Sequence, residues 1–445
     1  MSPVLVLLLA ACGPDLQVEM LVSEVVPTVV TVRWTASEPV AGRIRFGVDG
    51  DLDRATPWEA AAVEHETVLL GLGPEQDVRI EVEAEQEGDP WATAEAFART
   101  GSYGADVPRF TITPGSGEAF SGYVAVPSWE RPDGSGSRLA AIFDPAGRLV
   151  WATPLDEGEI GVRVRPSRDG SGVYYATASL YKDDDWPEAI HHVSWDGDTH
   201  VVLDTPGLHH DFVELVDGRL AWLGVEDRDV EGTPVVVDTL EQVARDGTRE
   251  VAWRAWDHLE ALGLSDLDPG EYGEENDVLH MNHLVASERD GTFLLTALRP
   301  GLVALVDATS GDPLWVFGGQ GSTFSLPSGE PPLGRIHGAA WNGERLSVFQ
   351  NDRGDARTDC SRVRRYALDE RSAEPVSTVA LDPCTWVWVF GGVEDRPDGG
   401  SLVTWSTAGR IDELDAAENL VYRLEGPVGS GFGYAVVVPS LYPEP

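Results

Sequence analysis

The residues best suited to chemistry in this chain are histidines and one arginine that recur in separate runs. The runs are His209-His210-Asp211-Phe212, Asp277-Val278-Leu279-His280-Met281-Asn282, Leu298-Arg299 and Arg335-Ile336-His337. Each lies beside an apolar, strand-like stretch with an Asp-Gly or Asn-Gly turn nearby. Arginine binds oxyanions through paired hydrogen bonds, and histidine transfers protons or attacks electrophiles near neutral pH. We therefore expect one polar site that acts on an oxyanion.

A structural role is the alternative for each histidine taken singly, because a histidine beside a strand is commonly a satisfied core residue. Four chemically suited groups in equivalent segments of a repeat favour convergence instead: His210, His280, Arg299 and His337. His191 and His192 belong to an expected outer strand, and we interpret them as structural.

The charge of the chain narrows the choice of partners. Among 445 residues, 75 are acidic and 32 are basic, which gives a formal net charge of −43. The hydrophobic fraction of 42% is that of a folded protein. So large a negative charge argues against binding to nucleic acid or to anionic lipid. We interpret it as a surface that favours solubility.

The N-terminus has the features of an export signal. An apolar run from Val4 to Ala11 is too short to span a bilayer, and Leu9-Ala10-Ala11-Cys12 resembles a bacterial lipobox. We expect residues 1–15 to be a lipoprotein-type signal segment with lipidation at Cys12. The protein would then be a periplasmic or cell-surface lipoprotein that contacts the membrane through its anchor alone. An ordinary cleaved signal is the alternative.

The other cysteines agree with export. Cys360 and Cys384 form an even pair, which predicts a disulfide in an oxidising compartment. Two thiols alone do not complete a tetrahedral metal site, so we expect no metal and no cofactor. Two free buried thiols are the alternative.

The N-terminal part of the chain predicts a small β-sandwich over residues 16–101. Val29 to Thr35, Gly42 to Phe46 and Val78 to Ala84 alternate apolar and polar residues, as half-buried strands do. The run Leu70-Gly71-Leu72-Gly73-Pro74 before the last of these strands resembles a corner of fibronectin type III domains. Residues 102–117, rich in Gly, Ser and Pro, are expected to be a linker.

Residues 118–445 carry a loose repeat. Turn dipeptides that introduce apolar strands recur at intervals of about fifty residues, which is typical of β-propeller blades. We predict an all-β fold, a six-bladed β-propeller preceded by the sandwich. Gly433 to Pro439 echoes Gly122 to Pro127, so a late strand should complete the first blade. An insertion at about 254–276, helix-like from Trp256 to Leu262, is expected over one face.

The segments that hold the chemically suited residues resemble the bacterial arylsulfate sulfotransferases over about residues 118–440. Such enzymes are six-bladed propellers that move a sulfuryl group from a phenolic sulfate ester to a phenol, without the nucleotide donor used by cytosolic sulfotransferases. The resemblance implies that His337 is the nucleophile and forms a sulfohistidine. It implies that His280, Asn282 and Arg299 bind the sulfate and leaving oxygens, and that His210 completes the site, with His209 the less favoured member of its pair.

Two other functions compete with aryl sulfate transfer. One is a noncatalytic cell-surface propeller that binds an anionic or glycan ligand, because propellers host many functions. The other, a quinone-dependent dehydrogenase, lacks an evident calcium site or a cysteine pair beside the channel. The expected partners are a small aryl sulfate and a phenol, and the residues leave the natural donor and acceptor, the balance of transfer and hydrolysis, and the oligomeric state open.

Overall fold

The strands of this chain form antiparallel sheets throughout, so the fold is all-β. A computed structural model describes residues 16–104, 107–118, 122–130, 138–156, 159–178, 188–264, 276–287, 289–351 and 360–443. The expected signal segment 1–15 and Cys12 lie outside the described residues. In the described ranges the helical elements are the 3-10 turns η1 (Ala255–His258) and η3 (Ser406–Ala408). No helix there is long and apolar enough to cross a membrane.

The N-terminal unit is one connected sheet that is held together by a long strand, β2. Its strands are β1 (Leu16–Val22), β2 (Val30–Val48), β3 (Arg54–Ala55), β4 (Glu59–Leu69), β5 (Asp77–Gln86) and β6 (Asp89–Arg99). The first half of β2 pairs with β1 and β4, and the second half pairs with β5. The predicted alternation is confirmed, since Val30, Val32 and Trp34 are all buried on one face.

Six further sheets follow, and each has a simple up-and-down order. Their strands are β8 (Tyr123–Glu130), β9 (Leu139–Phe143) and β10 (Leu149–Pro154); β11 (Gly161–Pro166), β12 (Gly172–Thr177), β13 (Ala189–Ser194) and β14 (His200–Asp204); β15 (Phe212–Glu214), β16 (Leu220–Val230), β17 (Thr233–Val243) and β18 (Arg249–Arg254); β19 (Met281–Ser287), β20 (Thr292–Ala297), β21 (Leu302–Asp307) and β22 (Pro313–Gly318); β23 (Ile336–Trp341), β24 (Arg345–Gln350), β25 (Arg362–Asp369) and β26 (Ser372–Ala380); β27 (Gly392–Asp395), β28 (Ser401–Trp405), β29 (Arg410–Leu414) and β30 (Leu420–Glu425).

Both ends of this region contribute strands to the ring. The late strands β31 (Ser430–Phe432) and β32 (Val436–Val438) pair with β8, which confirms the predicted closing strand. Strand β7 (Thr111–Pro114) pairs with β30, so the expected linker 102–117 contains a strand of the last sheet. Closure of this kind removes exposed sheet edges.

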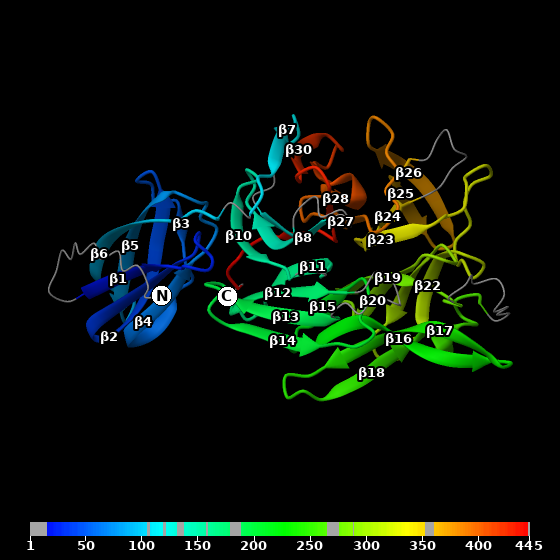
Figure 1. Ribbon diagram of the computed structural model, residues 1–445, viewed down its shortest axis with the longest axis horizontal. Coiled ribbons are helices and arrows are strands. Elements are labelled where there is room, and N and C mark those ends of the chain that lie inside the picture. Colours follow the sequence, from blue (N-terminus) through cyan, green and yellow to red (C-terminus); the bar gives the residue numbers. More distant parts are fainter. Residues whose placement is uncertain are drawn as a thin grey trace.

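Hydrophobic cores join each sheet to the next and the last sheet to the first. Trp151 packs with Tyr175, Phe212 with Ile190, Leu284 with Ala221, Phe317 with Tyr366, Phe349 with Trp405, and Phe143 with Leu424, each pair inside one shared cluster. The first strands of neighbouring sheets also contact one another, as β8 does β11, β15 does β19, β19 does β23 and β23 does β27. The sheets therefore surround a common axis as a β-propeller (Figure 1).

The N-terminal unit packs against the first two sheets of the ring. Val26, Val29 and Leu70 belong to the same hydrophobic cluster as Trp151 and Trp195. The chain returns to this joint at its end, where the Tyr442 hydroxyl accepts a hydrogen bond from Leu70 N and donates one to Val68 O, each at 3.0 Å. Figure 1 shows the C-terminus at the boundary between the blue unit and the ring.

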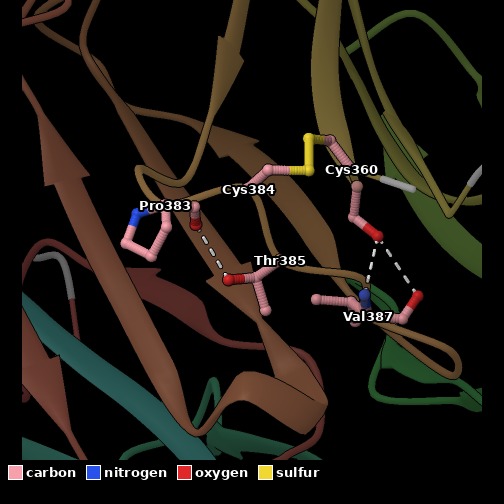
Figure 2. Close-up of a disulfide and its surroundings, with 6 residues drawn as sticks. Cys360, Pro383, Cys384, Thr385 and Val387 are labelled. Atoms are coloured by element: carbon pink, nitrogen blue, oxygen red, sulfur yellow. Dashed lines mark hydrogen bonds between the residues drawn. A yellow bond between two sulfur atoms is a disulfide. The ribbon is translucent and has the colours of Figure 1, made fainter. Parts of the chain in front are cut away.

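The predicted disulfide is confirmed. Cys360 and Cys384 are bonded, with their Cα atoms 5.1 Å apart, and so link the start of β25 to the segment before β27 (Figure 2). The Ser361 hydroxyl accepts a hydrogen bond from Val387 N at 2.8 Å. These contacts hold residues 384–390 close to the axis.

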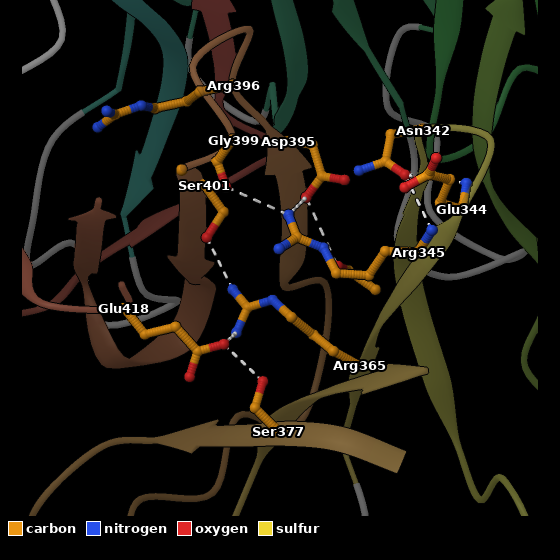
Figure 3. A network of polar contacts seen from close by, with 12 residues as sticks. Asn342, Glu344, Arg345, Arg365, Ser377, Asp395, Arg396, Gly399, Ser401 and Glu418 are labelled. Atoms are coloured by element: carbon orange, nitrogen blue, oxygen red, sulfur yellow. Dashed lines mark hydrogen bonds and ion pairs between the residues drawn. The ribbon is translucent and has the colours of Figure 1, made fainter. Parts of the chain in front are cut away.

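Charged side chains reinforce the contact between the fifth and sixth sheets (Figure 3). Arg365 on β25 is fully buried and donates to Glu418 Oε1 at 2.6 Å and to Ser401 Oγ at 2.8 Å. Arg345 on β24 lies 3.2 Å from Asp395 Oδ1 on β27. Each guanidinium crosses from one sheet to the next, so the packing of the two sheets is fixed by directional bonds as well as by apolar contact.

The run Trp256 to Leu262, which the sequence predicts to be helix-like, is only partly helical. Among the described residues of the insertion after β18, helical structure covers η1 (Ala255–His258), and a turn follows it. The η1 turn begins at Ala255, which is buried in the core between the third and fourth sheets. Residues 265–275 of the insertion lie outside the described residues. Packing of Ala255 and Leu259 against the sheets takes the place of a longer amphipathic helix.

Candidate functional site

The predicted histidines meet at one end of the axis. His210 precedes β15, His280 immediately precedes β19, and His337 is the second residue of β23. These are equivalent positions at the start of first strands, so the ring places them together. The ring centroid of His210 lies 5.0 Å from that of His280 and 6.0 Å from that of His337. The structure therefore brings these three histidines together, as expected from the repeat.

An unusual backbone conformation aims two of these side chains. His210 and His280 have φ angles of 61° and 54°, in the left-handed region that residues other than glycine seldom adopt. Local hydrogen bonds hold both turns: Asp211 N donates to His209 O at 2.7 Å, and His280 N donates to Asp277 Oδ1 at 3.1 Å. Such conformations cost about 1–3 kcal/mol each and persist where the surroundings fix them, commonly at functional sites.

His337 is held with one nitrogen free. Its Nδ1 lies 2.7 Å from Asn351 Oδ1. The orientation of that amide is fixed, because Asn351 Nδ2 donates to Val387 O at 2.8 Å and to Phe390 O at 2.9 Å. An amide oxygen only accepts, so His337 Nδ1 carries the proton and Nε2 has the lone pair. The geometry therefore leaves a nucleophilic nitrogen at Nε2.

His280 and Arg299 share one carboxylate. His280 Nδ1 lies 2.5 Å from Asp277 Oδ2, and Arg299 Nε lies 3.6 Å from the same oxygen. Both side chains are 31% exposed, whereas His337 is 2% exposed. The cationic and proton-donating groups thus face solvent at the end of the axis, and the candidate nucleophile lies deeper.

A second chain of contacts runs from His210 to a buried acid. His210 Nδ1 lies 3.0 Å from His209 Nδ1, and His209 Nε2 lies 3.3 Å from both Gly224 O and Asp238 Oδ1. The carbonyl can only accept, so His209 Nε2 carries a proton and neutral His209 accepts at Nδ1. His210 Nδ1 is then the donor, and its Nε2 is unprotonated. His209 is a positioning partner of His210.

Burial determines the charge of the imidazoles. It is the largest cause that lowers the pKa of His337 to about 3, and the hydrogen bond that His337 donates to Asn351 only partly offsets it. Burial and then the charge of His280 lower the pKa of His209 to about 4. The same causes, in the same order, place the pKa of His210 well below its usual range. These three rings are neutral near pH 7, as attack by His337 requires.

The two carboxyl groups beside these histidines, those of Asp238 and Asp277, have pKa values shifted in opposite directions. Burial, followed by the charge of Asp277, raises the pKa of Asp238 to about 7. Burial acts on Asp277 in the same sense, but its hydrogen bond to His280 and the charges of His280 and Arg299 outweigh it and lower the pKa of Asp277. Asp277 is therefore the ionised partner that keeps a proton on His280 Nδ1.

Asn282 does not line the open part of the site, contrary to the role implied by the resemblance. It is 0% exposed, its Nδ2 donates to Ile336 O at 2.7 Å, and its Oδ1 accepts from the Thr296 hydroxyl. Its amide ties β19 to β23 directly before His337. Packing of the inner strands buries this side chain, and we correct its role from binding substrate to positioning the nucleophile's strand.

A buried layer of polar groups lies below the imidazoles. Arg163 donates to Asp211 through Nε at 2.5 Å and Nη2 at 2.6 Å, and its guanidinium lies 4.8 Å from the centre of the Tyr434 ring. His283 belongs to this layer, where its ring lies 5.1 Å from that of Tyr434. His283 is thus below the site and not a further ligand at its mouth.

Several contributors were missed in the sequence. Asn351, Asp238 and Phe390 carry no motif, yet Asn351 orients His337 and the Phe390 ring lies 5.5 Å from that of His210. One signal was present: Gln350 and Asn351 are polar residues at the end of an apolar strand. Outer-strand histidines behave as expected, since His191 stacks on Tyr175 with centroids 4.4 Å apart. His258 stacks on Trp253, away from the axis.

No cluster of three or more His, Cys, Asp or Glu side chains that could hold a metal ion occurs within the described part of the chain. Asp277 Oδ2 binds His280, and Asp238 Oδ1 accepts a hydrogen bond from the Met281 N–H at 2.8 Å, whereas Asp238 Oδ2 is buried without a hydrogen-bond partner. The site thus combines a candidate neutral nucleophile (His337), a candidate proton donor (His280) and a guanidinium (Arg299).

Comparison with known proteins yields fold-level likeness only. No protein-family model and no curated protein matches the chain. A solved protein of unknown function from Bacteroides caccae is 14% identical, with a TM-score of 0.44, over 72% of this chain and 100% of its own. The periplasmic gluconolactonase of Pseudomonas aeruginosa is 15% identical, with a TM-score of 0.40, over 89% and 99%. A streptogramin B lyase is 11% identical, with a TM-score of 0.39, over 74% and 98%. No inference about activity follows from these similarities.

The low pKa of His337 predicts how stability depends on pH. Between about pH 3 and its ordinary value of 6.5, the unfolded state binds a proton at this residue that the folded state does not. The free energy of unfolding must therefore rise with pH across that window. On acidification from pH 7.5 to 4.5, His337→Asn should lose about 2 kcal/mol less stability than the wild type, measured by urea unfolding. Equal losses in the two proteins would show that His337 titrates normally when folded.

Proposed function

We propose that this protein transfers a sulfuryl group from an aryl sulfate ester to a phenol through a covalent intermediate on His337. The observation that carries the proposal is the set of imidazoles from three successive inner strands, with Arg299 at their exposed side. The tautomer of His337 supports it further, because Asn351 leaves Nε2 unprotonated. The proposal agrees with the resemblance to arylsulfate sulfotransferases, and no nucleotide or other cofactor enters the reaction.

In the first step, His337 Nε2 attacks the sulfur of the donor. The N–S bond forms while the bond between sulfur and the aryl oxygen breaks, and that oxygen leaves with the electron pair. His280 donates the proton from Nε2 to it, and Asp277 stabilises the second N–H of the ring. Arg299 holds the equatorial oxygens, where negative charge accumulates in a loose transition state.

In the second step, the acceptor phenol takes the place of the departed product. Its oxygen attacks the sulfur as the N–S bond breaks, which restores neutral His337. The phenolic proton returns to His280 Nε2, so the site ends the cycle in its starting protonation state. His210 is in ring contact with both His280 and His337 and completes the site. Splitting the transfer into two displacements is the advantage of covalent catalysis.

A noncatalytic role at the same site is the second candidate. His337 is only 2% exposed, so a bound anion or glycan could contact Arg299 and His280 without reaching the nucleophile. A binding module of this kind would need the exposed cation and would make no use of the free Nε2.

We also propose a specific architecture and a cellular location for this protein. The six sheets would be the blades of a six-bladed propeller, with the N-terminal unit a fibronectin III-like sandwich. Cyclic packing of the sheets and contact of β1 with β6 support this interpretation. The protein would be exported and anchored at Cys12 in the periplasm or on the cell surface. A disulfide is typical of those compartments.

The proposal predicts enzymatic turnover. Purified protein should release p-nitrophenol from p-nitrophenyl sulfate, form phenyl sulfate from added phenol, and need no nucleotide. His337→Asn should lower the rate at least about 10³-fold, because it removes the nucleophile. His192→Asn, a matched change on the outer strand β13, should keep wild-type activity. Phenol-independent rates that are equal in all three proteins would favour the binding module.

The role of His280 predicts a dependence on the leaving group. His280→Asn should lower the rate with phenyl sulfate by about 10²–10⁴-fold, since phenolate leaves poorly without a proton. The loss with p-nitrophenyl sulfate should be much smaller, because nitrophenolate is a stable anion. Steady-state rates with both donors test this. A loss of the same size for the two donors would assign His280 to binding alone.

The intermediate itself should be detectable. Donor supplied without phenol should add one sulfuryl group to the protein, seen by intact-mass measurement after rapid quenching, and peptide mapping should place it on His337. Added phenol should remove the adduct. A modification mapped to His210 or His280 would reassign the nucleophile.

A further inference from the structure

The propeller axis has a cavity at the end opposite the imidazoles. Its volume is about 480 Å³, and it lies among Arg165 at the end of β11, Glu214 at the end of β15, Ala286 near the end of β19, and β32. Those inner strands begin at the histidine end, so their last residues surround the other mouth. Cavities of this size hold small organic ligands.

Arg165 is the unusual residue in this cavity. Its Nε is buried without a hydrogen-bond partner, although the side chain as a whole is partly exposed, and the nearby charges of Asp211 and Glu394 favour its charged form. Arg163, two residues earlier on the same strand, shows the usual arrangement, because both of its bonds go to the Asp211 carboxylate. A buried polar atom normally has a hydrogen-bond partner, since burying it without one is costly.

The acidic groups nearby are already engaged. Glu214 Oε2 accepts a hydrogen bond from Arg168 N at 2.8 Å, and Glu394 Oε1 accepts one from Val437 N at 3.1 Å. Burial raises the pKa of both carboxyl groups, and for Glu394 the charge of Arg165 is the largest influence in the opposite direction. Burial is also the largest cause that lowers the pKa of Arg165 to about 10, so the guanidinium stays charged near pH 7.

The remainder of the cavity wall suits the body of an organic molecule. Val436, Val438, Leu441 and Tyr442 line it together with Arg165. Apolar walls with one convergent charged group are the usual composition of a ligand site.

We propose that this cavity is a second binding site, which takes a small organic anion whose carboxylate, phosphate or sulfate group pairs with Arg165. The site is separate from the imidazoles, because the layer of Arg163, Asp211 and Tyr434 fills the axis between them. It therefore does not depend on sulfuryl transfer, and it stands if the protein proves to be noncatalytic.

Thermal unfolding with inorganic anions tests the proposal. A ligand that binds only the folded protein raises the Tm. We expect sulfate or phosphate, added against chloride at constant ionic strength, to raise the Tm by about 2–4 °C. Acetate in a parallel series distinguishes a carboxylate site from one for tetrahedral anions.

Four proteins separate the two ends of the axis: the wild type, Arg299→Gln, Arg165→Met and the double variant. Arg299→Gln should keep a shift with at least one of the anions, and the double variant should lose it. Arg99→Gln, an exposed arginine of the N-terminal unit, is the matched control and should respond as the wild type does. Loss of the whole response in Arg299→Gln, or a response retained in the double variant, would overturn the proposal.

The stability of Arg165→Met gives an independent check. Without added oxyanion, replacing Arg165, whose Nε is buried without a hydrogen-bond partner, with an apolar side chain of similar length should change the Tm little. A Tm well below the wild type would mean that Arg165 has a structural partner, and would count against the site.

Discussion

The arrangement of the axis depends on one buried carboxylate, that of Asp211. It binds Arg163 of β11 through both oxygens, accepts the backbone N–H of Leu284 in β19 at 2.8 Å, and lies directly before β15. Three successive inner strands are thus fixed to one side chain. A buried ion pair of this kind adds little net stability compared with apolar packing, but losing one partner costs about 3–5 kcal/mol. The contribution of this ion pair here is to fix the register of the inner strands.

That register determines the chemistry above it. Asp211 follows His210, so the same turn that points the carboxylate into the axis points the imidazole toward His280 and His337. A buried layer lies below the site, and His280 and Arg299 are its partly exposed members. Burial then keeps His337 neutral, and Asp277 binds His280 Nδ1. The nucleophile and the acid that we propose have the same side chain and differ in their surroundings, and surroundings are what allow one residue type to fill two roles.

The arginines at the two ends of the axis have different surroundings. Arg299 is partly exposed and shares Asp277 with a histidine, whereas Arg165 is partly exposed in the lower cavity, where its Nε is buried without a hydrogen-bond partner. The C-terminal strands connect these features with the rest of the molecule, because β32 closes the first sheet, lines the lower cavity and leads to Tyr442 at the joint with the N-terminal unit.

The sequence alone determined the parts of this protein that are local or periodic. Alternating residues gave the strands, turns near every fiftieth residue gave the repeating sheets, an even cysteine pair gave the disulfide, and runs such as Asp277 to Asn282 marked the site. These signals can be recognised in the sequence because the periodicity of side chains and the chemistry of turns act over a few residues. Only the tertiary structure assigned Asn351 to His337, withdrew Asn282 from the pocket, placed His283 beneath it and left the Nε of Arg165 without a hydrogen-bond partner. Each of those outcomes depends on which side chains meet across the axis and in what register, and single pairings of that kind leave no pattern in the chain.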